Sequence, residues 1–421
     1  MSQLAIFGGE PVLKSQLPHY NSIGAKELEA VASVIRSGTL SGFYGSPGEQ
    51  YLGGPVVREF ERRWSEHFKI RHAISVNSAT SGLYAAMGAI DVRPGDEVIV
   101  PPFTMSATVV APIIYGGIPV FADIEPDTFC VDPGVAEALI SDRTKAIIAV
   151  NLFGHPARLS ELRALADRYG IYLIEDNAQG PLATENGKYA GTIGHIGVFS
   201  LNYHKHIHTG EGGMCVTDDD ELAIRLQMVR NHGENVVGPM EVKNISGIVG
   251  FNYRLTEMSA AVGIEQLKDI ERHVQARTFI AEKLSKGVKG LDGLIPPAVR
   301  SGCRHVYYVW GMKIDRDILG VSRRQFSRAL EAEGVPNSAG YVRPLYMLPM
   351  FRDRIAFGTY PFELSSIEYK EGICPVAERM HNEELLIYEP CMYDVAPDVA
   401  DLMAEAVRKV HRCRSELNTL E

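Results

Sequence analysis

Short apolar runs alternate with amphipathic stretches between residues 72 and 230. The runs have the length of buried strands, and the stretches between them carry apolar residues at helical spacing. The predicted strands are 73–76, 97–101, 119–123, 146–150, 172–175, 197–201 and 213–217. The predicted helices include 81–90, 105–114, 133–140, 159–169 and 221–230. Strands separated by helices in this way predict an α/β fold with a mainly parallel, seven-stranded sheet that has helices on both faces.

Further helices are predicted on both sides of this block. Residues 24–36 and 56–68 are amphipathic, and Pro55 stands at the favoured first position of the second helix. A long helical pattern runs from Thr256 to about Leu284. From about residue 287 the pattern changes to a strand-like stretch and two helices, at 307–313, 323–333 and 398–417. We therefore predict a large domain with its N-terminal segment over 1–285 and a smaller α+β domain over 286–421.

A glycine-rich segment, 41–54, separates the first two predicted helices. Connections of this length within a compact domain usually carry a function or are mobile. A lid over a binding site and an ordinary surface loop fit its composition equally well. The segment is therefore a candidate lid, and its sequence leaves both interpretations open.

Composition and charge exclude several functional classes. The chain has 421 residues and a net charge of -10 without a long basic run, which argues against nucleic acid as a partner. No apolar run approaches the length of a membrane span, and residues 1–7 lack the basic and apolar regions of a signal peptide. The six cysteines form no C-x-x-C pair, which favours reduced thiols over disulfides or a zinc site. We expect a cytoplasmic protein without a metal or membrane partner.

One lysine stands in the turn between two predicted strands. The apolar run 196–201 leads through Lys205, which has histidines on both sides, to a glycine cluster and the apolar run 214–216. A lysine that loses contact with water has a lower pKa and can act as an amine nucleophile at neutral pH. Because most loop lysines are solvated, the segments around Lys205 must decide between the two readings.

Polar residues also follow two other predicted strands. Strand 73–76 leads through Ala79 and Thr80 into a helix, whose first N–H groups and hydroxyls could hold an anion or simply cap the helix. Strand 172–175 ends in Glu175 and Asp176, and at least one carboxylate should face a site rather than solvent. Ligands of such sheets bind at the carboxyl ends of the strands. All of these polar groups therefore fall where a ligand is expected.

The segments together resemble the DegT/DnrJ/StrS type of sugar aminotransferase, a family of pyridoxal-phosphate enzymes with the aspartate-aminotransferase fold (fold type I). In that family a serine stands five residues before the lysine that binds the cofactor, and a Gly-Glu-Gly-Gly run begins five residues after it. Here these are Ser200, Lys205 and residues 210–213. Four further segments match in the family's order, so the resemblance covers nearly the whole chain.

The resemblance implies a role for each matching residue. Lys205 is implied to bind the cofactor and to move the substrate proton, and Asp176 to keep the pyridine nitrogen protonated. Asn252, in the segment 250–254, is implied to reach the cofactor phosphate of the neighbouring subunit, so a homodimer with shared active sites is expected. The other implied cofactor contacts are Ala79, Thr80 and Ser200 at the phosphate and Gln179 at the phenolic oxygen. The resemblance assigns no cofactor contact to Glu175, which is expected to support the site or the fold.

Several positions are less settled by the resemblance. The family commonly stacks an aromatic ring on the pyridine where this chain has Met105, whose thioether covers a ring more loosely; Phe103 could replace it only in a different loop conformation. Tyr346 stands where the family often has histidine, and this change would alter which ketone is accepted. His232, in an Arg-x-His-Gly segment, is interpreted as structural rather than catalytic.

The implied activity is transfer of an amino group from glutamate or glutamine to a keto-sugar. A nucleotide-linked 3- or 4-keto-sugar ranks first as the acceptor, and a keto-cyclitol ranks second. In dehydratase branches of the family a histidine replaces the lysine. His204 and His206 flank Lys205, but the spacing to Ser200 and to Gly210 keeps Lys205 at the lysine position, which favours transamination.

Two other functional classes fit the sequence less well than this activity. A regulatory, non-enzymatic pyridoxal-phosphate binder is disfavoured because Lys205, Asp176 and Gln179 occur together and because no basic helix-turn-helix segment is appended. A nicotinamide dehydrogenase is disfavoured because no Gly-x-Gly-x-x-Gly follows the first predicted strand of the sheet.

Overall fold

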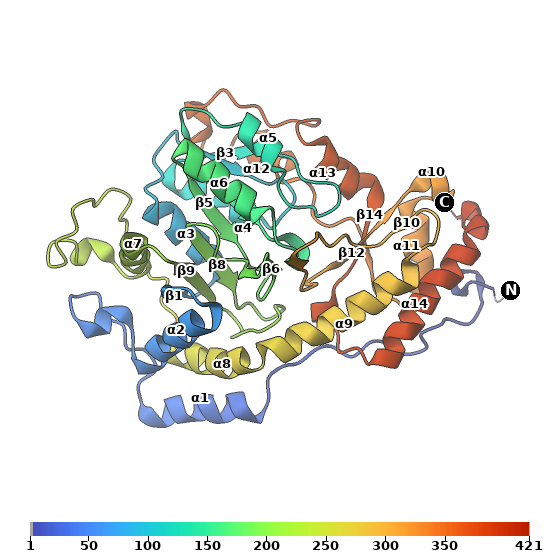
Figure 1. The fold of residues 1–421 in the computed structure, drawn as a ribbon, viewed down its shortest axis with the longest axis horizontal. Coiled ribbons are helices and arrows are strands. Elements are labelled where there is room, and N and C mark those ends of the chain that lie inside the picture. The colour runs from blue at the N-terminus through green and yellow to red at the C-terminus, as the bar shows by residue number, and fades with distance from the viewer. Residues whose placement is uncertain (1–2, 421) are drawn as a thin grey trace.

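A seven-stranded sheet forms the centre of the computed structural model, which describes residues 3–420 (Figure 1). Across the sheet the strands are β1 (His72–Val76), β9 (Gly213–Thr217), β8 (Ile196–Ser200), β5 (Tyr172–Asp176), β4 (Thr144–Val150), β2 (Glu97–Val100) and β3 (Ile118–Phe121). Strand β9 is antiparallel to both of its neighbours, and the other six share one direction. The predicted α/β class and the mainly parallel sheet are confirmed.

Helices lie on both sides of the sheet (Figure 1). Helix α2 (Pro55–Phe68) packs on β1, α3 (Ala79–Ala89) packs on β1, β8 and β9, and α6 (Leu159–Tyr169) packs on β4 and β5. The other helices of this part are α1 (Ala25–Ser37), α4 (Ser106–Val110), α5 (Pro133–Ala138), α7 (Asp220–Arg230) and α8 (Glu257–Lys268). Because both faces are covered, the central strands are apolar on both faces and buried along almost their whole length.

The C-terminal part of the chain builds a second, antiparallel sheet. Its strand order is β10 (Leu294–Ile295), β12 (Trp310–Ile314), β14 (Leu385–Tyr388) and β13 (Ser338–Ala339). The helices of this part are α9 (Ile270–Val288), α10 (Arg316–Leu319), α11 (Arg323–Ala332), α12 (Pro349–Arg352), α13 (Pro375–Arg379) and α14 (Pro397–Arg412). A small sheet of β11 (Cys303–Arg304), β6 (Thr184–Glu185) and β7 (Lys188–Tyr189) joins the two parts.

The first residues of the chain pack against this C-terminal part. Glu333 is fully buried, accepts hydrogen bonds from the N–H groups of Ala5 and Val12, and pairs with Lys409 at 2.9 Å. Three leucines join the same hydrophobic core: Leu4, Leu13 and Leu17. Both termini therefore lie at one end of the molecule (Figure 1). The predicted domain boundary near residue 286 falls close to the end of α9 and stays a prediction.

Two predicted helices are interrupted by specific residues. The pattern over 105–114 forms α4 followed by a 3-10 helix, Pro112–Tyr115, because Pro112 has no N–H to continue the α-helix. The pattern from Thr256 to Leu284 is divided at Asp269 into α8 and α9. The carboxylate of Asp269 is held there by Lys26 at 3.4 Å and by Arg272 at 3.2 Å.

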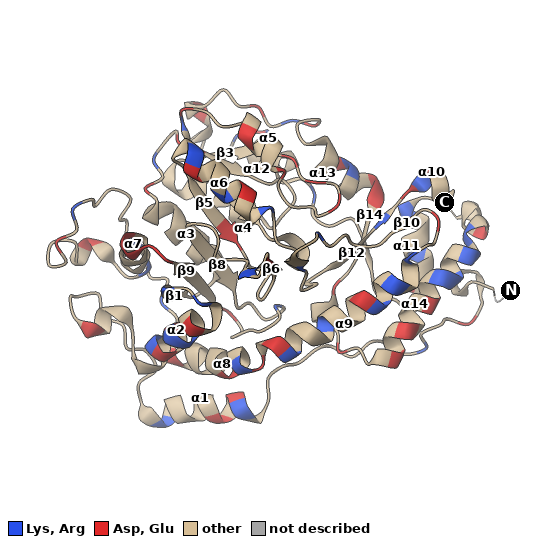
Figure 2. Ribbon diagram, in the orientation of Figure 1, with Lys and Arg blue, Asp and Glu red and all other residues tan. Residues whose placement is uncertain are grey.

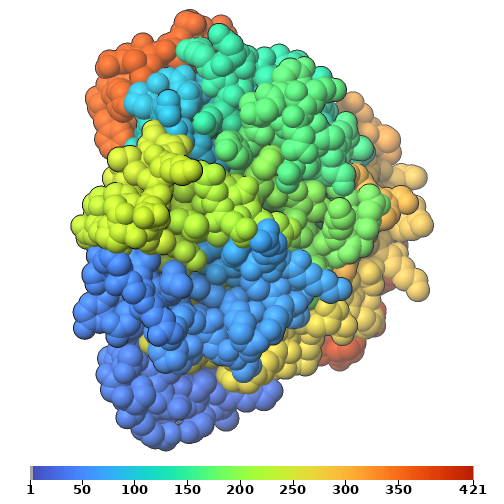
Figure 3. All heavy atoms as spheres, turned by 60° about the vertical axis from the view of Figure 1, so that its left-hand side comes forward, coloured from blue at the N-terminus to red at the C-terminus, as the bar shows by residue number. Residues whose placement is uncertain are grey.

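The 41–54 segment is anchored to the large part of the molecule. Asn231 donates from Nδ2 to the carbonyl groups of Tyr44 and Tyr51, at 3.0 Å and 2.9 Å. Tyr51 is buried in a small apolar cluster with Met228, Val236 and Ile248. In Figure 3 the segment, in blue, lies against the yellow-green residues of 231–250. These contacts favour a fixed surface segment over a free lid.

Charges of both signs are interspersed on the surface helices, as α9 and α14 show in Figure 2. Within residues 3–420, no helix is both long and apolar enough to cross a membrane. The same residues contain no group of three or more His, Cys, Asp or Glu side chains that could hold a metal ion. Within residues 3–420 the six cysteines form no disulfide, and all but Cys303 are buried.

Glu175 has a structural role inside β5. Its carboxylate is fully buried and accepts hydrogen bonds from three backbone N–H groups of the loop before β8 and from Asn151. The backbone donors are Gly191, Ile193 and Gly194. Burial raises the pKa of Glu175, and these bonds oppose the shift. The side chain thus fixes the loop that precedes β8.

Replacing Glu175 with Gln should lower the free energy of unfolding of the apoprotein by about 1–3 kcal/mol, because an amide NH₂ would face backbone donors that it cannot bond. Urea denaturation followed by fluorescence measures the change. Glu161→Gln on the exposed face of α6 is the matched control and should change stability by less than about 0.5 kcal/mol. Equal stability of both variants would contradict the assigned role.

Candidate active site

Strand register brings the predicted site residues to one edge of the sheet. Gly213, at the start of β9, pairs with Val76 at the end of β1 on one side and with Ser200 at the end of β8 on the other. Asp176, at the end of β5, pairs with Val198 in β8. The loops that carry the predicted cofactor contacts therefore leave the sheet at the same edge, as expected for a ligand site.

The N-terminus of α3 offers free backbone donors at this edge. Ser78 caps the helix by accepting from Ser81 N–H at 3.0 Å. Within residues 3–420, the N–H groups of Ala79 and Thr80 and the Thr80 hydroxyl have no hydrogen-bond partner. A Cβ atom at Gly213 would lie 2.7 Å from the Ala79 nitrogen, so only glycine leaves this cradle open. Free N–H groups at a helix N-terminus favour an anion such as phosphate.

Asp176 is a buried carboxylate with a fixed orientation. It is 5% exposed and accepts hydrogen bonds from the Thr108 hydroxyl at 2.7 Å and from the Ala178 N–H at 3.1 Å. Burial raises the pKa of Asp176, and the two hydrogen bonds and the charge of Lys205 oppose that shift. The carboxylate is therefore held in one position, with lone pairs left for a further donor.

Lys205 is a buried amine at the same edge. The residue is 9% exposed, and its Nζ lies 4.2 Å from the centre of the Tyr308 ring. Loss of water contact lowers the pKa of Lys205 to about 8, although the charges of Asp176 and Glu389 act in the opposite direction. No ion pair within 4.0 Å joins Lys205 to Asp176 in the described part of the chain. The amine and the carboxylate thus interact across a gap.

Gln179 connects the site to the C-terminal part of the chain. Its Oε1 accepts from Phe153 N–H at 2.7 Å, and its Nε2 donates to the Tyr341 hydroxyl at 3.2 Å. Tyr341 packs edge-on against Phe153 and Phe103, with ring centres 5.0 Å and 5.6 Å away. Burial raises the pKa of Tyr341 to about 12, so the phenol stays protonated at neutral pH.

The two candidates for the ring-stacking position differ in exposure. Met105 is 62% exposed at the N-terminus of α4, where its side chain is free to contact a ligand or another chain. Phe103 is fully buried against Tyr341 and is not free to cover a ring in the site. Asn252 is exposed, and its side chain has no hydrogen-bond partner within residues 3–420.

The histidines next to Lys205 are held neutral. His206 is fully buried and donates from Nε2 to the Val306 carbonyl at 2.9 Å, and burial lowers the pKa of His206 to about 3. His204 lies between the rings of Tyr203 and Tyr308, and burial lowers the pKa of His204 to about 4. Neither side chain therefore competes with Lys205 as a cation at neutral pH.

His232 and Tyr346 are tied into the structure rather than into the Lys205 site. His232 has a left-handed backbone conformation with φ of 49° and lies 3.6 Å from Glu234. Tyr346 is fully buried and donates its hydroxyl to Glu378. The contacts of both side chains agree with structural roles.

Four residues around the site were not singled out from the sequence: Thr108, Tyr308, Tyr341 and Glu389. Thr108 follows Thr104 by one helical turn, a spacing that could have pointed to it. The other three come from the C-terminal part of the chain, between 103 and 184 residues after Lys205. No local pattern connects them to the lysine segment, so only the fold identifies them.

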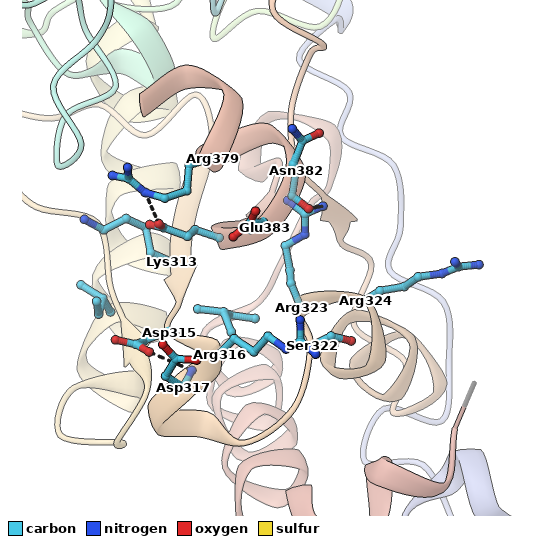
Figure 4. A pocket seen from close by; sticks show the side chains of 13 residues that line it. Lys313, Asp315, Arg316, Asp317, Ser322, Arg323, Arg324, Arg379, Asn382 and Glu383 are labelled. Carbon is cyan, nitrogen blue, oxygen red and sulfur yellow. Dashed lines mark hydrogen bonds and ion pairs between the residues drawn. The ribbon is translucent and has the colours of Figure 1, made fainter. Parts of the chain in front are cut away.

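A separate hollow of about 590 Å³ lies on the C-terminal part (Figure 4). Some of its charged side chains are paired with one another or with the backbone: Arg379 pairs with Glu384, and Arg323 donates to the carbonyl groups of Met380 and His381. None of the residues that line it belongs to the Lys205 site. The hollow is a charged surface groove without a chemical centre of its own.

The Lys205 site fits pyridoxal phosphate. Lys205 offers an amine for covalent attachment, Asp176 a carboxylate for the pyridine nitrogen, and Ala79 and Thr80 free donors for the phosphate. The fold and the site together define a pyridoxal-phosphate-dependent aminotransferase. Residues 22–406 match the model of the DegT/DnrJ/EryC1/StrS aminotransferase family, and the chain belongs to this family.

Several named relatives match over nearly the whole chain. The chain is 33% identical to the L-glutamine:2-deoxy-scyllo-inosose aminotransferase of Streptomyces kanamyceticus, over 99% of this chain and 98% of that one. It is 31% identical to the spore coat polysaccharide biosynthesis protein SpsC of Bacillus subtilis, over 92% of this chain and 95% of that one. The crystal structure of DesI in the presence of its TDP-sugar product has a TM-score of 0.80 at 28% identity and covers 99% of this chain and 98% of that chain. The predicted family, fold and cofactor are confirmed.

The buried amine predicts how cofactor binding depends on pH. The rate at which the apoprotein attaches pyridoxal phosphate should rise as the pH passes through about 8, because only the neutral amine of Lys205 is a nucleophile. Stopped-flow absorbance measures this rate. In Asp176→Asn the midpoint should move to lower pH, since the Asp176 charge raises the pKa of Lys205. A midpoint near 10.5, the ordinary lysine value, would contradict the burial of the amine.

Proposed function

We propose that the protein transfers an amino group from glutamine or glutamate to the ketone of a polyhydroxylated ring. A nucleotide-linked 3- or 4-keto-sugar is the first candidate acceptor. The observation that carries the proposal is the pairing of a buried amine, Lys205, with a buried carboxylate, Asp176, across a gap beside a helix N-terminus. Membership of an aminotransferase family supports the same reaction.

Each side chain of the site has a defined task in this reaction. Bound pyridoxal phosphate supplies an electron sink for the substrate carbon. Asp176, oriented by Thr108 and Ala178, would accept a hydrogen bond from the protonated pyridine nitrogen, and Ala79 and Thr80 would hold the phosphate. Gln179 faces the phenolic oxygen and is itself oriented by Phe153 and Tyr341.

Lys205 is the group that moves the proton. An amine with a pKa of about 8 exists partly as the neutral base at neutral pH, so it can take a proton from the donor carbon and return it. The neutral histidines on both sides supply no second charge, and the Tyr308 ring fixes one side of the amine. Proton transfer by Lys205 favours transamination over the dehydration carried out by family members that have histidine at this position.

A keto-cyclitol is the second candidate acceptor, and one observation favours it. The Streptomyces kanamyceticus relative, whose name specifies a carbocyclic inosose and glutamine, aligns with nearly the full length of both chains. DesI, by contrast, was crystallised with a TDP-sugar. Both ligands present a ring with several hydroxyl groups next to the carbon that carries nitrogen, so the residues that hold the cofactor suit either one.

We also propose that the active unit is a cytoplasmic homodimer with shared sites. The Asn252 side chain is exposed and has no hydrogen-bond partner in the described chain, which suits a residue that reaches another subunit. The neighbouring lobe of 41–54 and 231–250 exposes large apolar side chains: Tyr44 is 60% exposed, and Ile245 and Val249 are each 57% exposed. Exposed apolar side chains on neighbouring segments are typical of an interface.

A substrate panel tests the proposed reaction. Adding glutamine or glutamate to the cofactor-loaded protein should shift its absorbance to that of the amine form, and the correct ketone should shift it back. The panel contains nucleotide-linked 3- and 4-keto-sugars and keto-cyclitols. Lys205→Ala, which lacks the amine that binds the cofactor, is the negative control and should show neither change. A wild-type spectrum that no amino donor alters would favour a regulatory binding protein.

Mixed chains test the shared site. Lys205→Ala and Asn252→Ala chains should each be nearly inactive, and their mixture should recover about a quarter of the wild-type sites, because half of the dimers are mixed and each of those holds one intact site. Turnover after mixing measures the recovery. Subunit exchange is followed independently with a fluorescent label, and exchange without recovered turnover would count against the role of Asn252.

A further inference from the structure

Glu389 places a carboxylate beside Lys205 that the reaction described above does not use. It directly follows β14, whose last residue, Tyr388, pairs with Trp310 at the start of β12. Tyr308, two residues before Trp310, has its ring 4.2 Å from the Lys205 amine. The strand pairing therefore carries Glu389 to the side of the site that the C-terminal part supplies.

The charge of Glu389 affects the pKa values of several groups in the site. Its charge acts on the pKa of Lys205, Tyr308 and Tyr341, three groups that surround the proposed reaction centre. Lys205 is the cation whose charge lowers the pKa of Glu389, while burial raises it. The strand pairing brings residue 389 close to Tyr308, and these charge effects agree with a carboxylate near the amine and the two tyrosines.

Glu389 differs from the other acidic side chains of the site because it has no partner. Asp176 accepts two hydrogen bonds and Glu175 accepts four. The Glu389 side chain is half-buried, and within residues 3–420 it accepts no hydrogen bond and forms no ion pair. The half-buried Glu389 carboxylate keeps some contact with water, and its acceptor sites are open to donors that arrive with a ligand.

We propose that Glu389 forms a hydroxyl-binding subsite for the acceptor ketone, and this proposal rests on the proposed function. A carboxylate has two oxygens that accept from two neighbouring hydroxyl groups at once. Because Lys205 works at the carbon that gains nitrogen, the bound hydroxyl groups are those on ring carbons next to that carbon. The ligand class is an uncharged polyhydroxylated ring, either a cyclitol or the sugar ring of a nucleotide-linked substrate.

The negative charge of Glu389 also sets what the subsite rejects. A carboxylate or phosphate placed there would face a like charge in a poorly solvated space, which disfavours it by several-fold or more. The diphosphate of a nucleotide-linked sugar and the carboxylates of the amino donor must therefore lie away from Glu389. The subsite thus separates the acceptor from the donor, although both use the same amine.

Two variants and two half-reactions test the subsite in the cofactor-loaded full chain. Glu389→Leu should lower kcat/KM for the acceptor by about 10–100-fold, mainly through KM, because the hydroxyl groups lose a charged acceptor. Glu389→Gln, which keeps the shape and one acceptor oxygen, should lose less. The rate of the donor half-reaction, measured by the absorbance shift with glutamine, should stay within about twofold of wild type in both variants.

The control variant is Glu383→Gln, an exposed glutamate in the groove of Figure 4 on the same part of the chain. It should leave both half-reactions unchanged. Acceptor analogues that lack one hydroxyl next to the ketone should react poorly with wild type and lose little further activity in Glu389→Leu. An unchanged kcat/KM for the acceptor in Glu389→Leu overturns the proposal. An equal loss in both half-reactions also overturns it, because Glu389 would then act on the protonation of Lys205 and not on the acceptor.

The wild-type protein alone shows whether the proposed function fails: in that case neither an amino donor nor a ketone changes its absorbance spectrum. In that case titration of the cofactor-loaded wild type and Glu389→Gln with myo-inositol tests the subsite directly. Saturable binding that Glu389→Gln weakens supports the subsite without turnover. Absent binding, or equal binding to both proteins, overturns it.

Discussion

Keeping one amine out of water is the constraint on which the rest of the site depends. A charged lysine loses hydration when it is buried, and within residues 3–420 no carboxylate lies within 4.0 Å of the Lys205 amine to compensate, so the neutral form is favoured. The surroundings do not undo this effect: the neighbouring histidines are uncharged at neutral pH, and the amine lies over the face of the Tyr308 ring. A general base near neutral pH results from burial rather than from any unusual residue type.

The reversed direction of β9 brings the phosphate-binding and lysine segments next to each other. Because β9 runs against its neighbours, its first residue, Gly213, lies beside the ends of both β1 and β8. Because Gly213 has no side chain, the N-terminus of α3 can lie close to the strand that leads to Lys205. A purely parallel arrangement would place the beginning of the strand at the opposite edge, and the phosphate cradle and the lysine turn would lose their common border.

The sequence was sufficient for the features that local periodicity and spacing encode. Buried parallel strands are continuous apolar runs, so all seven strands of the central sheet could be predicted, and the Ser200, Lys205 and Gly210 spacing pointed to the cofactor lysine. It was insufficient where distant segments meet. Tyr308, Tyr341 and Glu389 carry no sign of the site in their own neighbourhoods, and the lack of a partner for Glu389 is visible only in three dimensions. The breaks at Pro112 and Asp269 arise from single residues inside otherwise regular helical patterns.

The attachment of the chain's first residues to its last third has a mechanical consequence. The backbone passes between the two parts once before α1 and again along α9, so the C-terminal part is suspended from two connections rather than one. A rigid body with two such connections can rotate about the axis that joins them, which makes the two connections a hinge. Tyr341 and Glu389 both belong to the C-terminal part, so such a rotation would carry them together toward or away from the amine.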